Sequence, residues 1–377
     1  MTINIPTPLL GGLSPQAFMR RHWQKKPLLI RQALPGGEPA LDRAALFALA
    51  ATEGVESRLI EQRGANWSLR HGPFTRRQLP PLARPGWTLL VQGVDLHLQA
   101  AHRLLSRFRF ASDVRLDDVM ISYATDGGGV GPHIDSYDVF LLQLAGRRRW
   151  RIGRTKQPVL MPDMPVKILA NFEPEQAWTL EPGDMLYLPP GWAHDGVADG
   201  ECLTASIGFR APTRNEVGQQ VLQRMLDGAD DDDGSGRRYR GASQAATDQP
   251  ARIPARLAEF AADAVRRLVD DPSSLHCALG EWLSEPKAQT WFEPVEALPG
   301  RCAVALDRRT RMLYDGSHVF INGESFVASG RDARLIQRLA DHRALDGKAV
   351  TQLSAPAWEL LQSWVFQGWL CAVAGEA

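Results

Sequence analysis

The sequence predicts a mixed α and β protein with a β-rich first half and a second half that begins with helices. Short alternating apolar runs, broken by Gly and Pro, fill residues 1–212, which is typical of β-structure. Helical spacing of apolar residues dominates 213–290, and short strands and helices share 291–377. We therefore expect three regions with these boundaries, because 377 residues exceed one ordinary small core.

Composition limits the classes of function. Hydrophobic residues make up 44% and charged residues 23%, as in soluble globular proteins. Basic and acidic residues both number 43, so bulk charge gives no reason to expect direct nucleic-acid binding. We find no secretory signal and no apolar run long enough for a membrane span. The cysteines lack a CxxC spacing and are expected to be reduced thiols of a cytoplasmic protein: Cys202, Cys277, Cys302 and Cys371.

Local signals place elements in the first two regions. Ser14 is an expected N-cap for a helix that runs to Trp23. Apolar residues at 186–188 predict a short strand, which the "PPG" that follows ends in a turn. Helices are expected at 215–226, around 257–268 and after Pro272. A polar loop near 228–250, with an acidic run and an arginine cluster, is expected to be solvated and mobile.

The last region is expected to contain short strands and two helices. The strands are predicted at 302–306, 312–314 and 319–321, and the helices around 333–342 and 356–367.

Two separated motifs provide a possible metal site. His133 and Asp135 are two residues apart, so on a strand both side chains point to the same side. His194 follows a "PPG" turn further along the chain. Two imidazoles and one carboxylate are the ligands of non-haem Fe(II) sites that keep one face open for substrate and oxygen.

Each motif alone has an ordinary explanation, namely a surface His–Asp pair and a loop histidine. The combination of a glycine-rich approach, His-x-Asp, apolar strands, "EPGD" and "PPGxxH" favours the metal site. The other histidines lack such a context and are interpreted as structural or exposed: His22, His71, His97, His102, His276, His318 and His342.

Three consecutive arginines precede Trp150. A turn is expected at Ala145–Gly146, and beyond it alternation places Arg147, Arg149 and Arg151 on a wet face. Arg148 then shares the inward face with Trp150 and Ile152. A buried guanidinium needs an anion, and beside a ferrous site the natural anion is the distal carboxylate of 2-oxoglutarate. A protein carboxylate, or a side chain that reaches solvent, is the alternative.

Together, "MISYATDGGGVGPHIDSYDVFLLQLAGRRRWRIG", "LEPGDMLYLPPGWAHDG" and "ASIGFRAP" resemble the bacterial ribosomal oxygenases of the JmjC/cupin group. The similarity is closest to the arginine hydroxylases that act on a large-subunit ribosomal protein, and it is dense over residues 14–215. It implies a double-stranded β-helix, then a helical dimerisation region, then a winged-helix-like domain. It also implies a homodimer, Fe(II), and 2-oxoglutarate and O2 as co-substrates.

The resemblance assigns roles to individual residues. It implies iron binding by His133, Asp135 and His194. It implies 2-oxoglutarate binding by Arg148 and Ser122. It also implies that His133 and Asp135 contribute to co-substrate binding, through the metal that they hold. The expected reaction couples decarboxylation of 2-oxoglutarate to succinate with hydroxylation of a C–H bond.

A cationic arginine substrate needs acceptors near the iron, and Asp126 and Ser206 are the candidates, although Asp126 could instead cap a turn. The run Gly127–Gly129 is expected to let a substrate backbone approach closely. A JmjC-type demethylase of methylated lysine or arginine and a cupin-like binding module without catalysis remain as alternatives.

Overall fold

The computed structural model describes residues 2–36, 41–227, 238–240, 246, 249–296, 298 and 300–373. The chain divides into two compact units, residues 1–211 and 212–377. Each unit has its own apolar core. Among the described residues, no helix is both long enough and apolar enough to cross a membrane.

The first unit is mainly β-structure. After a 3₁₀ turn at Pro8–Leu10, its elements are α1 (Pro15–Arg21), β1 (Leu28–Ile30), α2 (Arg43–Ala50), β2 (Ser57–Arg63), β3 (Asn66–His71), β4 (Trp87–Val91), α3 (Val94–His97), α4 (Gln99–Ser106), β5 (Leu116–Ala124), β6 (His133–Ile134), β7 (Val139–Arg154), β8 (Gln176–Leu180), β9 (Met185–Leu188) and β10 (Trp192–Phe209).

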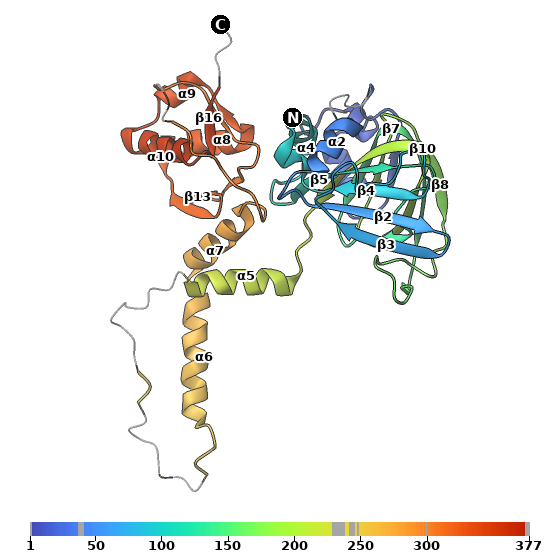
Figure 1. Cartoon of the computed structure of the whole chain (residues 1–377). Coiled ribbons are helices and arrows are strands. Elements are labelled where there is room, and N and C mark those ends of the chain that lie inside the picture. Colours follow the sequence, from blue (N-terminus) through green and yellow to red (C-terminus); the bar gives the residue numbers. More distant parts are fainter. Residues whose placement is uncertain are drawn as a thin grey trace. The chain divides into compact units, whose positions relative to one another are not determined.

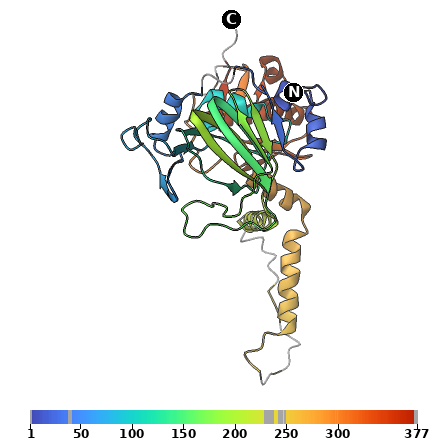
Figure 2. The same ribbon diagram turned by 90° about the vertical axis from the view of Figure 1, so that its right-hand side faces the viewer.

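One ten-stranded antiparallel sheet organises this unit. Its order is β1-β9-β7-β10-β5-β4-β2-β3, with β6 on β10 and β8 on β7. Figures 1 and 2 show the strongly curved strands wrapped around a common interior. Because β7 and β10 are long and paired with each other, side chains on their inner faces meet in that interior.

The N-terminal helices cover the outer face of the sheet. Ser14 caps α1 by accepting a hydrogen bond from the Ala17 backbone N–H at 3.2 Å, as expected from the sequence. Phe18 of α1 is fully buried and packs on Phe140 of β7 and Tyr187 of β9. The outer face of the sheet therefore belongs to a large apolar core.

The second unit combines helices with two small sheets. Its elements are α5 (Arg214–Asp227), α6 (Ala255–Val269), α7 (Pro272–Ser284), β11 (Val304–Leu306), β12 (Met312–Tyr314), β13 (His318–Ile321), β14 (Glu324–Val327), α8 (Gly330–His342), β15 (Ala344–Leu345), α9 (Gly347–Thr351), α10 (Ala355–Phe366) and β16 (Leu370–Ala372). The sheets are β15-β11-β16 and β12-β13-β14, and they share a core with α8 to α10.

The elements expected in this unit are present within a few residues of their predicted bounds, and the mixed α and β class is confirmed. The polar loop expected near 228–250 lies largely outside the described residues.

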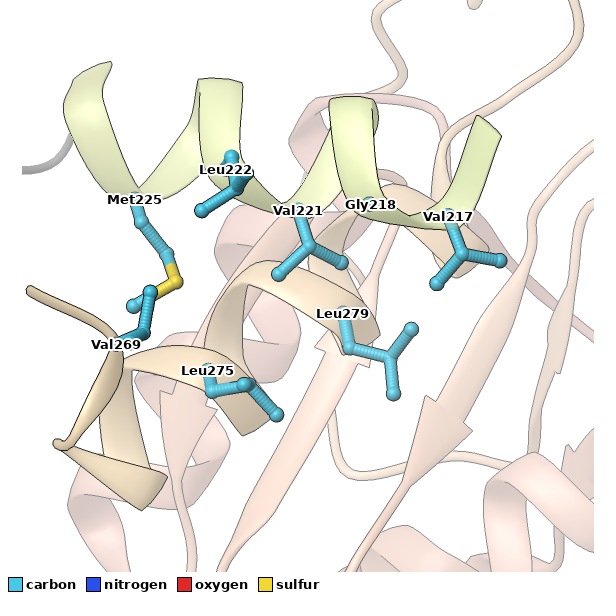
Figure 3. A pocket seen from close by; sticks show the side chains of 8 residues that line it. All are labelled: Val217, Gly218, Val221, Leu222, Met225, Val269, Leu275 and Leu279. Carbon is cyan, nitrogen blue, oxygen red and sulfur yellow. The ribbon is translucent and has the colours of Figure 1, made fainter. Parts of the chain in front are cut away.

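Helices α5, α6 and α7 line an open apolar pocket of about 240 Å³ (Figure 3). The lining residues come from all three helices: Val217, Gly218, Val221, Leu222, Met225, Val269, Leu275 and Leu279. Val221 and Met225 of α5 pack against Ala278 of α7, so α5 and α7 have a shared core of their own.

Candidate metal centre

His133, Asp135 and His194 come together in the interior of the sheet. Their ligand atoms all lie within 4.8 Å of one another, and His194 Nε2 is 3.6 Å from Asp135 Oδ2. The pairing of β6 with β10 sets this arrangement, because His133 lies directly opposite His194 in the register. The two ring centroids are 4.2 Å apart. The chemistry and spacing of this group fit a divalent metal ion with open coordination positions.

The backbone orients both imidazoles. His133 Nδ1 lies 2.8 Å from the carbonyl oxygen of Gly131, and His194 Nδ1 lies 3.1 Å from that of Trp192. Since a carbonyl only accepts, each Nδ1 carries the proton and each Nε2 keeps a free lone pair. This is the arrangement in which histidine ligates a metal through Nε2.

Burial sets the protonation of the group. Burial, together with the nearby His133, lowers the pKa of His194 to about 3, so this imidazole stays neutral and able to ligate. Burial raises the pKa of Asp135, although His133 and a hydrogen bond from Tyr137 act in the opposite direction. A bound cation would stabilise the Asp135 carboxylate that burial disfavours.

Arg148 is buried on the inner face of β7, with 5% of its surface exposed. Its Nη1 donates to Ser122 Oγ of β5 at 3.1 Å. Its Nε and Nη2 are buried and have no hydrogen-bond partner among the described residues. A guanidinium with two unused donors and a neighbouring hydroxyl fits a carboxylate such as that of 2-oxoglutarate.

The neighbouring arginines point outward, as the alternation predicts. Arg147 and Arg149 are exposed, and Arg147 pairs with Asp199 at 3.0 Å. Arg151 is half-buried and bonds to Asp195.

The prediction of a turn between two strands at Ala145–Gly146 is wrong. Strand β7 runs unbroken from Val139 to Arg154 and pairs with β10 on both sides of these residues, where the register shifts. Gly146 has φ +61°, and a Cβ there would lie 2.0 Å from the carbonyl oxygen of Glu201. The pair is therefore an irregularity within one strand, and it needs glycine because the opposing backbone is so close.

The glycine run has a structural role within the chain. A Cβ on Gly128 would lie 2.5 Å from the carbonyl oxygen of Trp87, and one on Gly129 would lie 2.7 Å from that of Gly196. These glycines let the chain's own backbone segments pack closely. The expected approach of a substrate backbone stays a prediction.

The two candidate substrate residues lie in different places. Asp126 is exposed, and its carboxylate accepts a hydrogen bond from the Gly200 backbone N–H at 2.9 Å. Gly200 is six residues beyond His194 on β10, roughly 20 Å at the usual rise per residue. This geometry favours the turn-capping alternative for Asp126, whose role towards substrate stays a prediction.

Ser206 is half-buried and lies opposite Met120 of β5 and Leu141 of β7. Leu141 packs in the same cluster as Trp150, on the inner face. Ser206 therefore faces the interior, although its contact with a substrate stays a prediction.

Tyr137 is a site residue that the sequence reasoning missed. It hydrogen-bonds Asp135, and desolvation, followed by the charges of Asp135 and Asp118, raises its pKa, although 39% of the residue's surface is exposed. Its position two residues after Asp135, in "HIDSYD", is the signal that could have identified it.

Comparison with known proteins relates both halves of the chain to described families. Residues 103–217 match the model of a JmjC domain, and residues 267–371 match a ROXA-like winged helix. A ribosomal protein uL16 3-hydroxylase from Escherichia coli (strain K12) is 33% identical over 345 residues, which cover 87% of this chain and 89% of the relative.

Solved structures agree with this similarity. An X-ray structure of E. coli ycfD superposes with a TM-score of 0.81 at 29% identity, covering 95% of this chain and 97% of the other. The structure of YcfD, a ribosomal oxygenase from E. coli, in complex with cobalt and 2-oxoglutarate has a TM-score of 0.79 at 29% identity, covering 96% and 99%. The expected JmjC fold with a winged-helix domain is thereby confirmed.

Proposed function

Because this chain belongs to the family of JmjC-domain ribosomal oxygenases, we propose that it hydroxylates a side chain of the ribosomal protein uL16, using Fe(II), 2-oxoglutarate and O2. The single observation that carries the proposal is the cluster of His133, Asp135 and His194, which lies on the same inner surface as Arg148, whose Nε and Nη2 have no partner among the described residues. Together they offer one place for a metal and one for the far end of a dicarboxylate.

Each member of the site has a defined task in this proposal. His133 Nε2, Asp135 and His194 Nε2 hold the metal, and the carbonyls of Gly131 and Trp192 keep both imidazoles in the ligating tautomer. When bound, Fe(II) supplies the activation of O2 that C–H hydroxylation requires. Arg148 and Ser122 bind the distal carboxylate of 2-oxoglutarate, and the apolar side chains around Trp150 exclude water.

We propose arginine as the modified residue type. Besides the proposed ligand Asp135, the carboxylates of Asp118 and Asp117 contribute negative charge near Tyr137, and Arg58 opposes them. A cationic side chain is attracted by such a field. Ser206 is a candidate acceptor for the guanidinium on the inner face, and Asp126 is the second candidate.

The test uses purified protein, Fe(II), 2-oxoglutarate and recombinant uL16. We expect succinate to form, uL16 to gain the mass of one oxygen atom, and fragment spectra to place that oxygen on an arginine. The Asp135→Ala variant is the control and should give neither product. Failure of the intact protein to form succinate would contradict the proposal.

The same assay separates the two alternatives. A demethylase would release formaldehyde from a methylated lysine or arginine peptide and leave unmethylated uL16 unchanged. A cupin-like binding module would give neither product, although it could still retain a ligand.

We further propose a homodimer formed through α5 to α7, in keeping with the resemblance to this family. These helices expose large apolar side chains, at fractions of 47% for Leu222, 55% for Leu226 and 58% for Val265. Such apolar faces are stabilised when a symmetric partner covers them. Light scattering at micromolar concentration should give twice the chain mass, and Leu222→Glu should reduce it. A monomer mass for the unmodified protein would contradict this.

The remaining partner proposals follow from charge and substrate. Equal numbers of basic and acidic residues give no general attraction to RNA, so we expect the winged helix to make protein contacts and not to bind nucleic acid directly. We propose a cytoplasmic location, in keeping with a ribosomal substrate.

A further inference from the structure

We propose that the indole N–H of Trp150 donates a hydrogen bond to a carboxylate of bound 2-oxoglutarate, so that Trp150 positions the co-substrate between Arg148 and the metal. This inference deepens the proposed function and rests on it. It adds a neutral donor to the site, in contrast to the charged donor of Arg148.

Trp150 lies between the two ends of the proposed co-substrate site. It follows Arg148 by two residues on the inner face of β7, and the Arg148 Cζ atom is 5.7 Å from the centroid of the indole. On its other side, the His194 ring centroid is 5.9 Å from the indole centroid. The indole therefore neighbours both ends of the proposed co-substrate site.

The indole nitrogen lacks an acceptor. Trp150 is only 5% exposed, and within the described part of the chain its buried Nε1 has no hydrogen-bond partner. Buried Trp N–H groups usually find a partner, because a buried donor without one is destabilising. Arg148 Nε and Nη2 share this condition on the same face of the same strand. Three unsatisfied donors on one face of one strand, among the described residues, indicate an anion as the missing partner.

The packing of the indole directs its N–H away from β10. A Cβ added to Gly196 would lie 2.6 to 2.9 Å from three carbons of the six-membered ring, Cζ3, Cη2 and Cε3. That ring edge therefore rests on the β10 backbone at Gly196, which is opposite Trp150 in the register. Nε1 belongs to the other edge of the bicycle, so it faces away from β10. The absence of a side chain at position 196 makes this orientation of the indole possible.

An indole N–H can only donate, which restricts what it can bind. Its partner must be an acceptor, such as a carboxylate oxygen of 2-oxoglutarate. A 2-keto acid without the distal carboxylate offers acceptors at the keto-acid end alone. Comparison of 2-oxoglutarate with such a keto acid therefore identifies the end of the co-substrate that Trp150 contacts.

The experiment measures binding and needs no turnover. Trp150→Phe removes the N–H and keeps an aromatic ring, and the dissociation constant for 2-oxoglutarate is measured by calorimetry on anaerobic Fe(II)-loaded protein. We expect affinity to fall about tenfold, as for loss of a hydrogen bond to a charged group. The matched control is Trp87→Phe, since Trp87 is buried in the apolar core of the outer face and its Nε1 already donates to the carbonyl oxygen of Pro81 at 3.2 Å. It should bind within about twofold of the unmodified protein.

The second ligand is 2-oxopentanoate, which has the keto-acid end but no distal carboxylate. If Trp150 contacts the distal carboxylate, Trp150→Phe weakens 2-oxoglutarate only. If it contacts the keto-acid end, both ligands bind more weakly. Either result supports the inference. Unchanged affinity for 2-oxoglutarate, or an equal loss in Trp87→Phe, overturns it.

A measurement on the unmodified protein covers the case in which Trp150→Phe does not fold. Zn(II)-loaded protein labelled with ¹⁵N at its tryptophan indoles should show one indole N–H resonance moving downfield when 2-oxoglutarate is added. Binding without such a shift overturns the inference alone. Absence of any 2-oxoglutarate binding by the Fe(II)-loaded protein would instead contradict the proposed function.

Discussion

The two faces of β7 bury very different side chains. On the outer face, Phe140 and Leu142 are fully buried among apolar residues that include those of the N-terminal helices. Apolar side chains of the same chain surround them. On the inner face, Arg148 and Trp150 are each 5% exposed, yet three of their donors have no partner among the described residues.

This difference indicates that the outer face of β7 stabilises the fold, whereas the inner face binds a ligand. An apolar face reaches its lowest free energy by close packing alone. A polar inner face with unused donors destabilises the free protein, by about 1–3 kcal/mol for each buried unsatisfied group, and recovers that free energy when an anion binds. Substitutions on the two faces should therefore change different measured quantities.

The largest effect is expected at the metal ligands. His133→Ala or Asp135→Ala removes one of the three proposed ligands, so succinate formation should fall below detection. The exposed His71, at the end of β3, provides the control, and His71→Ala should retain full turnover. Full activity in either ligand variant would show that the metal is bound elsewhere.

The next largest effect should appear on the outer face as lost stability. Phe140→Ala leaves a cavity among Phe18, Phe108 and Tyr187, and we expect the free energy of unfolding to fall by about 3–5 kcal/mol. Urea unfolding measures this loss. The molecules that stay folded should bind 2-oxoglutarate nearly as before, and a parallel loss of affinity would mean that the two faces are not separable.

Arg148→Ala should act in the opposite way, on binding. A charge-assisted hydrogen bond contributes about 1.5–3 kcal/mol, which corresponds to a loss of roughly 10- to 100-fold in 2-oxoglutarate affinity. Arg148→Lys should recover only part, because an ammonium group cannot make the bidentate pair.

Arg147→Ala and Arg149→Ala are the matched controls for this position. Both side chains are exposed, so the dissociation constant should change little. If one of them proves the sensitive position, the inner face has been assigned to the wrong residues.

The smallest expected effect is a gain in stability. Arg148→Met removes a buried charge with unused donors, so the metal-free protein should become more stable, by about 1 kcal/mol or more. Arg149→Met, at an exposed position, should change stability by less than about 0.5 kcal/mol. Urea midpoints of both variants measure the contrast, and a loss of stability in Arg148→Met would mean that the guanidinium is already satisfied.

Many features of the fold and of the candidate site could be predicted from the sequence, because local residue spacing determines them. Two-residue spacing predicted a shared direction for His133 and Asp135, and alternation predicted the inward side chain of Arg148, which is buried in the structure. The motifs also carried the family resemblance. The helices at 214–227 and 330–342 followed from apolar periodicity.

The features that could not be predicted depend on contacts between distant segments. Gly128 and Gly146 are required by carbonyl oxygens of Trp87 and Glu201, which no local pattern reveals. Trp150 was expected on the inner face, but its unpaired nitrogen becomes apparent only once its neighbours are placed. A regular period also cannot locate the irregularity at Ala145–Gly146.

That irregularity changes the face of the sheet on which the even-numbered side chains of β7 lie. Before it, the even-numbered Phe140, Leu142 and Leu144 face outward, and after it the even-numbered Trp150 and Ile152 face inward. The side-chain amide of Gln143 holds the reversal by donating to the carbonyl oxygen of Ala145 at 2.8 Å.

Three arginines in succession make this strand tolerant of changes in its length. If β7 paired regularly through Ala145–Gly146, Arg147 and Arg149 would turn inward and Arg148 outward. Either arrangement therefore delivers a guanidinium to the interior. Insertion or deletion of one residue at this point would still leave a cation in the interior. Trp150, in contrast, would turn to the outer face.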